Sequence, residues 1–527
     1  MAFPIFQVGN GITNRETNPM DLGRQTKHLP RCDHITNQLR RIIPQMQLNS
    51  IPSMTSSIQT PASSINPGET PLKDLATGSS KYMLPPGPRP WPVIGNLNLI
   101  GPFPHRSMHE LSTRHGPLMS LRFGSYPVVV GSSVDMAKFF LKTHDLAFLD
   151  RPAVASARHI LYNGSDGLWA PYGPYWCQGR KLCQNELLSA SGIKSTEHIR
   201  SEEVRCMLRD VSAAASRDGG AVVRLKDHLS MASFNVVSRM ALGKKYIFNG
   251  AGSLMASEAF RWMIQEFFFL NGAEYIKRMK RLSKMIDPLL EHVLGEHSER
   301  RRRQGEGFVP RDMVDRLLQL ADDASLEAPI ERDGIKAFIL WALSELLRNP
   351  EAMAKATGEL DRVVGGGRLV TEADFPRLPY LEAVVKETLR VHPVAPLLAP
   401  QLSREDTSVG GYDIPAGTRV FVRSASSEEF RPERFVGSGV DVKGRDLEFL
   451  PFGSGRLMCP GLGLGMKMVQ LMLANLLQAF AWRLPDGVGV DDLSMEEKFG
   501  LSMPRMVPFE AVPEPKLPAH LYDGPCP

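Results

Sequence analysis

The stretch from Phe452 to Gly461, FGSGRLMCPG, constrains the fold most, because it places Cys459 in a glycine-rich loop before an apolar segment. Glycine has no β-carbon, so a glycine-rich backbone can approach a flat, bulky partner closely. This loop contains three glycines: Gly453, Gly455 and Gly461. Pro460 fixes its own φ angle and prevents a helix from starting earlier. The apolar segment from Leu462 to Trp482 predicts a long helix directly after the loop.

Cys459 therefore lies just before a helix N-terminus, whose dipole favours a thiolate over a thiol. A thiolate is a soft metal ligand, and one cysteine leaves the other coordination positions of a metal to another group. Haem fits this arrangement, since the porphyrin supplies four nitrogens and the protein supplies one axial sulfur. Judged by itself, however, an isolated cysteine is more often a buried, inert core thiol, and that alternative stays open at this point.

The loop resembles the cysteine loop of the cytochrome P-450 family of haem-thiolate monooxygenases, with the pattern Phe-x-x-Gly-x-Arg-x-Cys-x-Gly. Four positions match in register: Phe452, Gly455, Cys459 and Gly461. In the family the arginine reaches a haem propionate; here it falls on Leu457, and Arg456 stands one place earlier. The resemblance implies haem b (iron protoporphyrin) with Cys459 as the iron ligand, and it makes the other matched residues and Arg456 candidate haem contacts.

Other pieces of the family pattern occur in the same order along the chain. Trp176 and Arg180 lie four apart and would share a helix face, and in the family this pair contacts a haem propionate. Glu387 and Arg390 lie three apart, and in the family they join an arginine matched by Arg434 in a buried cluster that braces the cysteine loop. Without the resemblance, the first pair is an ordinary surface contact and the second an exposed ion pair worth a few tenths of a kcal/mol.

The helix that crosses the haem in the family departs most from the pattern. Residues 337–349, AFILWALSELLRN, run from its expected start straight into its expected end, without the Gly-Gly-x-Asp-Thr-type kink. In the family a threonine and an acid of that kink deliver protons during oxygen activation. No threonine occurs between Thr196 and Thr357, so no catalytic residue is assigned. Two further segments, one just before Glu274 and one between Val420 and Glu428, are shorter than the resemblance implies.

Composition indicates one large globular domain. The chain has 527 residues, of which 43% are hydrophobic and 23% charged, and its mild net charge of +5 does not call for a nucleic-acid partner. Residues 1–82 are polar and lack apolar periodicity, so we expect a disordered or atypical segment there. The domain is expected over residues 83–515, with a tail over 516–527. Six cysteines without a CxxC pair predict neither a disulfide framework nor a zinc site, and suit a reducing compartment.

Local patterns predict several elements that can be checked against the structure. We expect two strands within Leu118–Ser133, a β-hairpin over Thr407–Val422, an aromatic core helix over Phe260–Leu270 and a solvated helix end at Arg300–Arg303. His392 matches no metal-ligand spacing and is expected to pack or cap a helix.

The resemblance implies a mainly α fold with a small β portion in one cytochrome P-450-type domain, similar to plant microsomal members. It implies an oxidoreductase that inserts one oxygen atom of dioxygen into a small apolar or phenolic plant metabolite, with an NADPH-dependent reductase as electron donor. Family members sit in the endoplasmic reticulum membrane; no run here approaches the roughly 20 apolar residues of a spanning helix, so membrane association and a cytoplasmic location both stay open. Two alternatives also remain: a catalytically impaired haem-binding remnant and an incomplete gene model.

Overall fold

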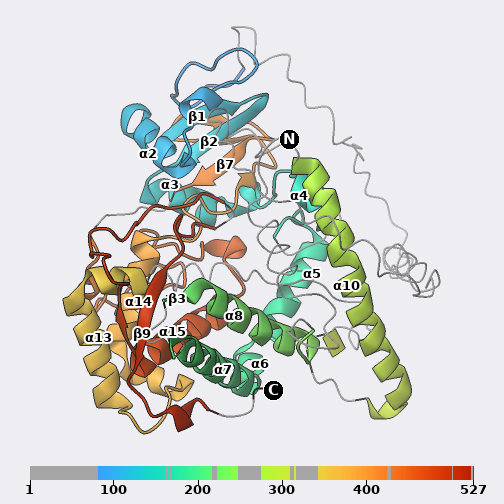
Figure 1. Ribbon diagram of the computed structural model, residues 1–527. Helices are drawn as coiled ribbons and strands as arrows, with labels where there is room; N and C mark the ends of the chain where they lie inside the picture. The colour runs from blue at the N-terminus through green and yellow to red at the C-terminus, as the bar shows by residue number, and fades with distance from the viewer. Residues whose placement is uncertain are drawn as a thin grey trace.

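The computed structural model describes residues 81–161, 164, 168–216, 222–246, 275–308, 312, 314–315, 342–423, 429–500, 502–523 and 526. Within them the chain is mainly helical, with three small sheets; β1 (Leu118–Phe123), β2 (Tyr126–Gly131) and β7 (Arg419–Val422) lie together at one end, whereas β3 (Val223–Arg224) and β9 (Glu510–Pro515) lie among the helices (Figure 1). The expected fold class is confirmed. The aromatic segment Phe260–Leu270 and most of the expected disordered region lie outside the described residues.

Several helices pack around one central helix, α15 (Leu462–Ala479), which is apolar on nearly all sides and therefore buried. None of the described helices combines the length and apolar character needed to cross a bilayer. The other labelled helices are α2 (Pro104–His115), α3 (Val134–Lys138), α4 (Ala155–His159), α5 (Pro174–Leu182), α6 (Ala190–Ser195), α7 (Glu197–Ala215), α8 (Leu225–Leu242), α10 (Tyr275–Gln304), α13 (Pro350–Val363) and α14 (Pro379–Val391).

The largest sheet has the order β1-β2-β7-β4. Its strands are β1 (Leu118–Phe123), β2 (Tyr126–Gly131), β7 (Arg419–Val422) and β4 (Gln401–Leu402). β1 and β2 form the predicted antiparallel pair, whereas β7 runs parallel to β2. The hairpin prediction over Thr407–Val422 is correct only in its first half, where β5 (Thr407–Val409) pairs with β6 (Tyr412–Ile414). β7 leaves that hairpin because all four of its residues are buried, which suits a central strand.

The predicted end of the long apolar helix is wrong by three residues. Phe480 to Arg483 form strand β8, which pairs with β9 (Glu510–Pro515); β9 also pairs with β3 (Val223–Arg224). Trp482 therefore belongs to a strand, and its indole nitrogen donates to the Leu476 carbonyl. A run of aromatic residues favours a strand once a partner strand is available, and that partner lies far away in the sequence.

The structure contains a disulfide, although the cysteine spacing predicted no disulfide framework. Cys206 of α7 and Cys526 form a disulfide across 320 residues of sequence. The fold brings the C-terminal residues onto the helical core, where Leu517 and Tyr522 are buried. One cross-link of this kind is not a framework, and its sequence separation gives no local signal for the pairing.

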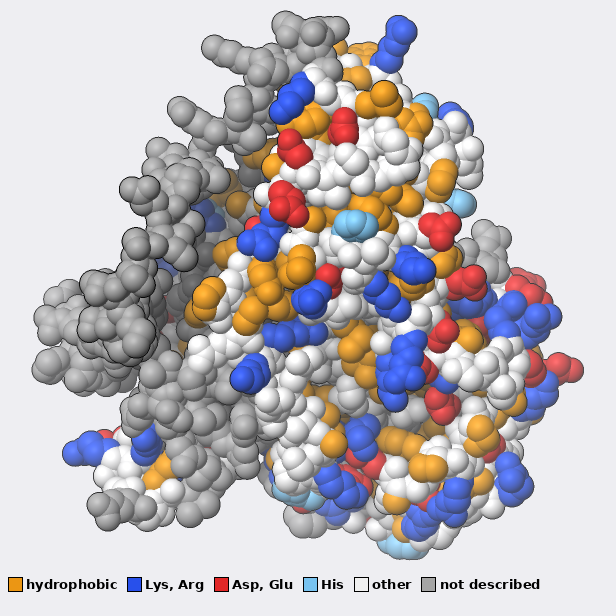
Figure 2. Space-filling model, turned by 180° about the vertical axis from the view of Figure 1, so that it is seen from behind, with side chains coloured by type: hydrophobic (Ala, Val, Ile, Leu, Met, Phe, Trp, Pro, Cys, Tyr) orange, Lys and Arg blue, Asp and Glu red, His pale blue; other side chains and the backbone are white. Residues whose placement is uncertain are grey.

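Charges on the surface are mixed rather than segregated. The face shown in Figure 2 carries Lys and Arg interspersed with Asp and Glu over much of its lower half. At the predicted solvated helix end, Arg302 and Arg303 are exposed and both pair with Glu299. Arg300, in contrast, points inward to acidic residues that follow α10. The prediction for this basic run is therefore confirmed for its exposed members.

Candidate functional site

The Cys459 loop has a defined backbone conformation before α15. The amide of Cys459 donates to the Phe452 carbonyl at 2.9 Å, and the amide of Met458 donates to the Gly455 carbonyl at 3.3 Å. Gly453 and Gly455 have φ angles of 72° and 66°, which residues other than glycine rarely adopt. The half-buried Cys459 thus lies three residues before the first residue of α15, as predicted.

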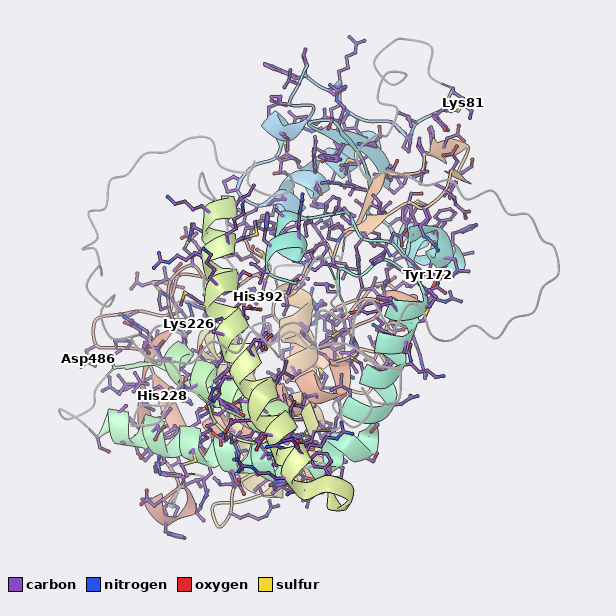
Figure 3. The ribbon with its side chains drawn as sticks, turned by 90° about the vertical axis from the view of Figure 1, so that its right-hand side faces the viewer. Lys81, Tyr172, Lys226, His228, His392 and Asp486 are labelled. Carbon is purple, nitrogen blue, oxygen red and sulfur yellow. A yellow bond between two sulfur atoms is a disulfide. The ribbon has the colours of Figure 1, made fainter. Side chains whose placement is uncertain are left out.

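Helix α5 packs a cation against this loop. Arg180 lies over the Trp176 ring, with 5.6 Å between the guanidinium carbon and the ring centroid, so the two share a helix face as predicted. Arg180 donates from Nη2 to the carbonyl of Met458, directly before Cys459. Tyr172, labelled beside the start of α5 in Figure 3, packs 5.6 Å from the Trp176 ring. Burial lowers the pKa of Arg180, and the charges of Cys459 and Cys183 oppose that shift.

Among the cysteines that the structure describes, Cys459 is the best candidate ligand. Cys177 is exposed and Cys183 is buried, and burial raises the pKa of the Cys183 thiol even though Arg180 opposes the shift. Cys206 and Cys526 are joined in the disulfide. A metal ligand must be a thiolate in a partly open position, and the Cys459 loop meets this condition.

The buried cluster predicted around Glu387 is present. The side chain of Glu387 on α14 has no exposed surface. Its carboxylate forms ion pairs with the Nε atoms of Arg390, at 2.7 Å, and Arg434, at 3.0 Å. The backbone amide of Arg431 also donates to Glu387, at 2.6 Å. Arg390 in addition donates to the Glu429 carbonyl. One carboxylate therefore fixes the segment 429–434 against α14, which supports the chain leading to the Cys459 loop.

Two other polar residues, one of them singled out from the sequence, lie in the interior. His392, labelled in Figure 3, follows the last residue of α14 and places its Nε2 2.7 Å from Glu345 Oε1, which fits the packing or capping role expected of it. Gln401 of β4 is 3% exposed, and its Oε1 has no hydrogen-bond partner. Buried polar atoms usually have a hydrogen-bond partner, so this amide oxygen has capacity for a further one.

The residues present fit a haem. A partly open cysteine supplies a soft axial donor, the desolvated Arg180 can partner an anionic propionate, and the Gln401 amide has capacity left for a hydrogen bond. Arg456 does not join this group: its Nη1 lies 2.6 Å from Asp145 Oδ1. Sequence reasoning gave no role to Asp145, which lies 311 residues away from Arg456 in the chain.

A family model described as cytochrome P-450 matches residues 85–507. The chain belongs to the cytochrome P-450 family. Members of this family are haem-iron monooxygenases.

Among its relatives, trimethyltridecatetraene synthase of Zea mays is 45% identical, over 85% of this chain and 92% of that protein. Flavonoid 3'-monooxygenase of Petunia hybrida is 38% identical, over 84% of this chain and 94% of that protein. The fold is also that of a solved zebra fish cytochrome P-450 with progesterone, which has a TM-score of 0.67 and 25% identity, and the match covers 79% of this chain and 100% of that one.

The helix that the family resemblance places across the haem is only partly described. Residues 342–348 are helical, whereas residues 335–340, where its start was expected, and residue 341 lie outside the described residues. The short segment next to Glu274 and residues 424–428 of the other short segment also lie outside the described residues. The alignment to the maize relative is 513 positions long, but it includes only 85% of the 527 residues of this chain, so some of its positions are filled by the relative alone. That relative therefore carries positions that are missing from this chain.

A second group of potential metal ligands lies at the end of α10. His297, Asp312 and Asp315 offer one ligand atom each, all within 4.8 Å of one another. Arg300 pairs with both carboxylates, and its Nη2 lies 3.0 Å from Asp312 Oδ2. Because this guanidinium already supplies positive charge to the acids, we interpret the group as a buried ion-pair network.

The same network predicts a pH-dependent contribution to stability. His297 Nδ1 lies 2.8 Å from the Val293 carbonyl and Nε2 lies 3.1 Å from Asp312, so both ring nitrogens face acceptors. Burial opposes the charged ring, but these hydrogen bonds outweigh it and raise the pKa of His297 above 6.5. The stabilisation is therefore complete below pH 6.5 and is lost as the pH rises through the raised value. Thermal unfolding of wild type and His297→Gln should show a difference in Tm that shrinks above pH 6.5; a constant difference would contradict this assignment.

Gly455 should tolerate no side chain. A β-carbon there would lie 1.9 Å from the Leu141 carbonyl oxygen, in addition to the strain of its φ of 66°. Gly487 has a φ of 82° with no atom near its β position, so Gly487→Ala measures the backbone strain alone. We expect Gly455→Ala to destabilise the protein by at least about 2 kcal/mol more than Gly487→Ala, because the backbone around Leu141 must move. Urea unfolding of both variants tests this, and equal losses would contradict it.

Proposed function

We propose that this protein is a haem-thiolate monooxygenase of plant specialised metabolism, using haem b and electrons from an NADPH-dependent reductase. The single observation that carries the proposal is the Cys459 loop, with its thiol before α15 and Arg180 on the adjacent carbonyl. Haem held there would supply the oxidative chemistry, and its thiolate ligation favours cleavage of the O–O bond. The protein would contribute orientation, charge and exclusion of water.

Each candidate residue has a defined task in this proposal. Cys459 would bind the iron, while Gly455 and Gly461 would let the backbone pass close to the porphyrin. Trp176 and Arg180 would hold a propionate, since the indole covers one side of the guanidinium. The Phe452 carbonyl accepts a hydrogen bond from the Cys459 amide and would so fix the turn of the loop. Arg456 was a candidate haem contact; its pairing with Asp145 supports a bracing role instead.

The substrate is proposed to be a small apolar metabolite. The maize relative is named for a methyl-branched tetraene and the petunia relative for a flavonoid, so the two names span an apolar hydrocarbon and a phenolic compound. Higher identity to the maize protein, 45% against 38%, favours the apolar class. An endoplasmic reticulum membrane location is likewise proposed from family resemblance.

A catalytically impaired haem protein is the second candidate. It is favoured by the missing kink in residues 337–349 and by the positions of the maize relative that this chain lacks. If the transcript contains the missing segments, the sequence is an incomplete gene model.

Three measurements separate these possibilities. Reduced protein treated with carbon monoxide should show the strongly red-shifted Soret band of thiolate ligation. Turnover of terpenoid and flavonoid substrates with a plant reductase then separates an enzyme from a remnant. A thiolate-type spectrum without any turnover, together with a transcript that lacks the missing segments, would overturn the monooxygenase and leave the remnant.

A further inference from the structure

Arg456 of the Cys459 loop makes an ion pair with a residue outside the loop. Its Nη1 lies 2.6 Å from Asp145 Oδ1. The Asp145 side chain is 8% exposed, whereas that of Arg456 is 50% exposed. The two partners therefore differ in exposure. The carboxylate of Asp145 is largely removed from water, and its charge is compensated by an arginine whose side chain comes from the surface.

Asp145 lies on a structured element that also contacts the loop through its backbone. It begins the short 3-10 helix Asp145–Phe148, which follows the π-helical turn Phe139–Thr143. Within that π-helical turn, the Leu141 carbonyl lies where a β-carbon on Gly455 would be placed. The loop and this segment are thus packed at backbone contact distance, and Asp145 and Arg456 stand beside that contact.

The loop is consequently held from two directions. Arg180 donates to the Met458 carbonyl from α5, and Asp145 accepts from Arg456 on the other element. The two held residues, Arg456 and Met458, lie three and one positions before Cys459. Fixing both of them limits the angles at which the thiol can be presented.

We propose that Asp145 is a positioning residue for the Cys459 thiolate, acting through Arg456. The arginine shifted by one place in the loop thus serves to anchor the loop to the segment 139–148 instead of contacting haem. The inference rests on the proposed haem-thiolate function, because it assigns a task to residues around that ligand. Loss of the anchor would leave the cysteine in place but let the loop present its sulfur in orientations that bind an iron more weakly or leave the sulfur protonated.

The contrasting interpretation is an ordinary surface ion pair. Such a pair contributes little and would leave the loop unaffected when broken. The burial of Asp145 argues against it, since a charge-assisted hydrogen bond to a buried carboxylate costs more to break than one in water. The two interpretations differ in what they predict for the loop itself rather than for overall stability.

The test uses the full chain expressed with ample haem, in five forms: wild type, Asp145→Asn, Arg456→Gln, the double variant and Glu203→Gln. Glu203 of α7 is a matched control, because it is a buried acid that pairs with Arg239 of α8 at 2.7 Å. Two quantities are measured. The first is the fraction of thiolate-type Soret absorbance in the reduced, carbon monoxide-treated protein, and the second is amide hydrogen exchange of the peptide containing Cys459.

We expect Asp145→Asn and Arg456→Gln to lower the thiolate-type fraction and to speed exchange of the Cys459 peptide by about tenfold, with no further change in the double variant. Glu203→Gln should lower Tm while leaving both quantities as in wild type. Equal exchange and equal spectra in wild type and Asp145→Asn would overturn the inference. A wild type without any thiolate-type band would overturn the proposed function instead, and the exchange data would still decide the role of Asp145.

Discussion

Replacing Cys459 by alanine is expected to abolish the thiolate-type Soret band completely. Cys459 is the described cysteine that combines partial exposure with a position at the start of α15, and no other described cysteine can reach its place in the loop. The variant should still fold, because the loop conformation depends on glycines and on the Cys459 amide rather than on its sulfur. Haem content, circular dichroism and the reduced carbon monoxide spectrum measure these properties together.

Two control variants make this result specific. Cys177 is exposed, so Cys177→Ala should leave stability within about 0.5 kcal/mol of wild type and the spectrum unchanged. Cys183→Ala removes a buried thiol next to Arg180 and should reduce stability without removing the band. If Cys459→Ala retains the pigment of the wild type, the haem-thiolate assignment is wrong.

Features that depend on spacing within one segment could be predicted from the sequence. The position of Cys459 before a helix, the shared face of Trp176 and Arg180, and the pairing of Glu387 with Arg390 all follow from offsets of three or four residues. The strands β1 and β2 were predictable for the same reason, since a short turn joins them. Family resemblance supplied the third member of the Glu387 cluster, Arg434, which spacing alone does not provide.

Features that depend on a distant partner could not be predicted. Arg456 was a candidate haem contact because it stands one place before the family's arginine position, and Asp145 reaches it only in the folded chain. The Cys206–Cys526 disulfide and the early end of α15 have the same origin, since one needs the C-terminal segment and the other needs β9. Such contacts are decided by how elements pack, which the pattern of a single segment does not encode.

The second large effect is expected at Glu387. Glu387→Gln removes the charge of a fully buried carboxylate that serves Arg390, Arg434 and the Arg431 amide. Glutamine keeps the shape but leaves the largely buried Arg390 without its counter-charge and Arg434 with only the exposed Glu429. Breaking one side of a buried ion pair costs about 3–5 kcal/mol, and we expect a loss near the lower limit because one amide oxygen still accepts.

The variant should also lose haem before it unfolds. The cluster fixes segment 429–434 against α14, and the packing of Phe435 on Phe449, with ring centroids 5.1 Å apart, connects this segment to the approach of the Cys459 loop. Urea unfolding followed by Soret absorbance and by circular dichroism should therefore give separate midpoints in Glu387→Gln, with the Soret midpoint lower. A single shared midpoint would show that the cluster stabilises the whole domain without a particular effect on the loop.

Glu110→Gln is the matched control for this comparison. Glu110 of α2 pairs with Arg114 one helical turn later, but its side chain is 68% exposed. An exposed pair of this spacing contributes only a few tenths of a kcal/mol, so the control should remain within about 0.5 kcal/mol of wild type. Equal losses in the two variants would mean that burial of Glu387 confers no special role, and the bracing of the cysteine loop by this cluster would have to be abandoned.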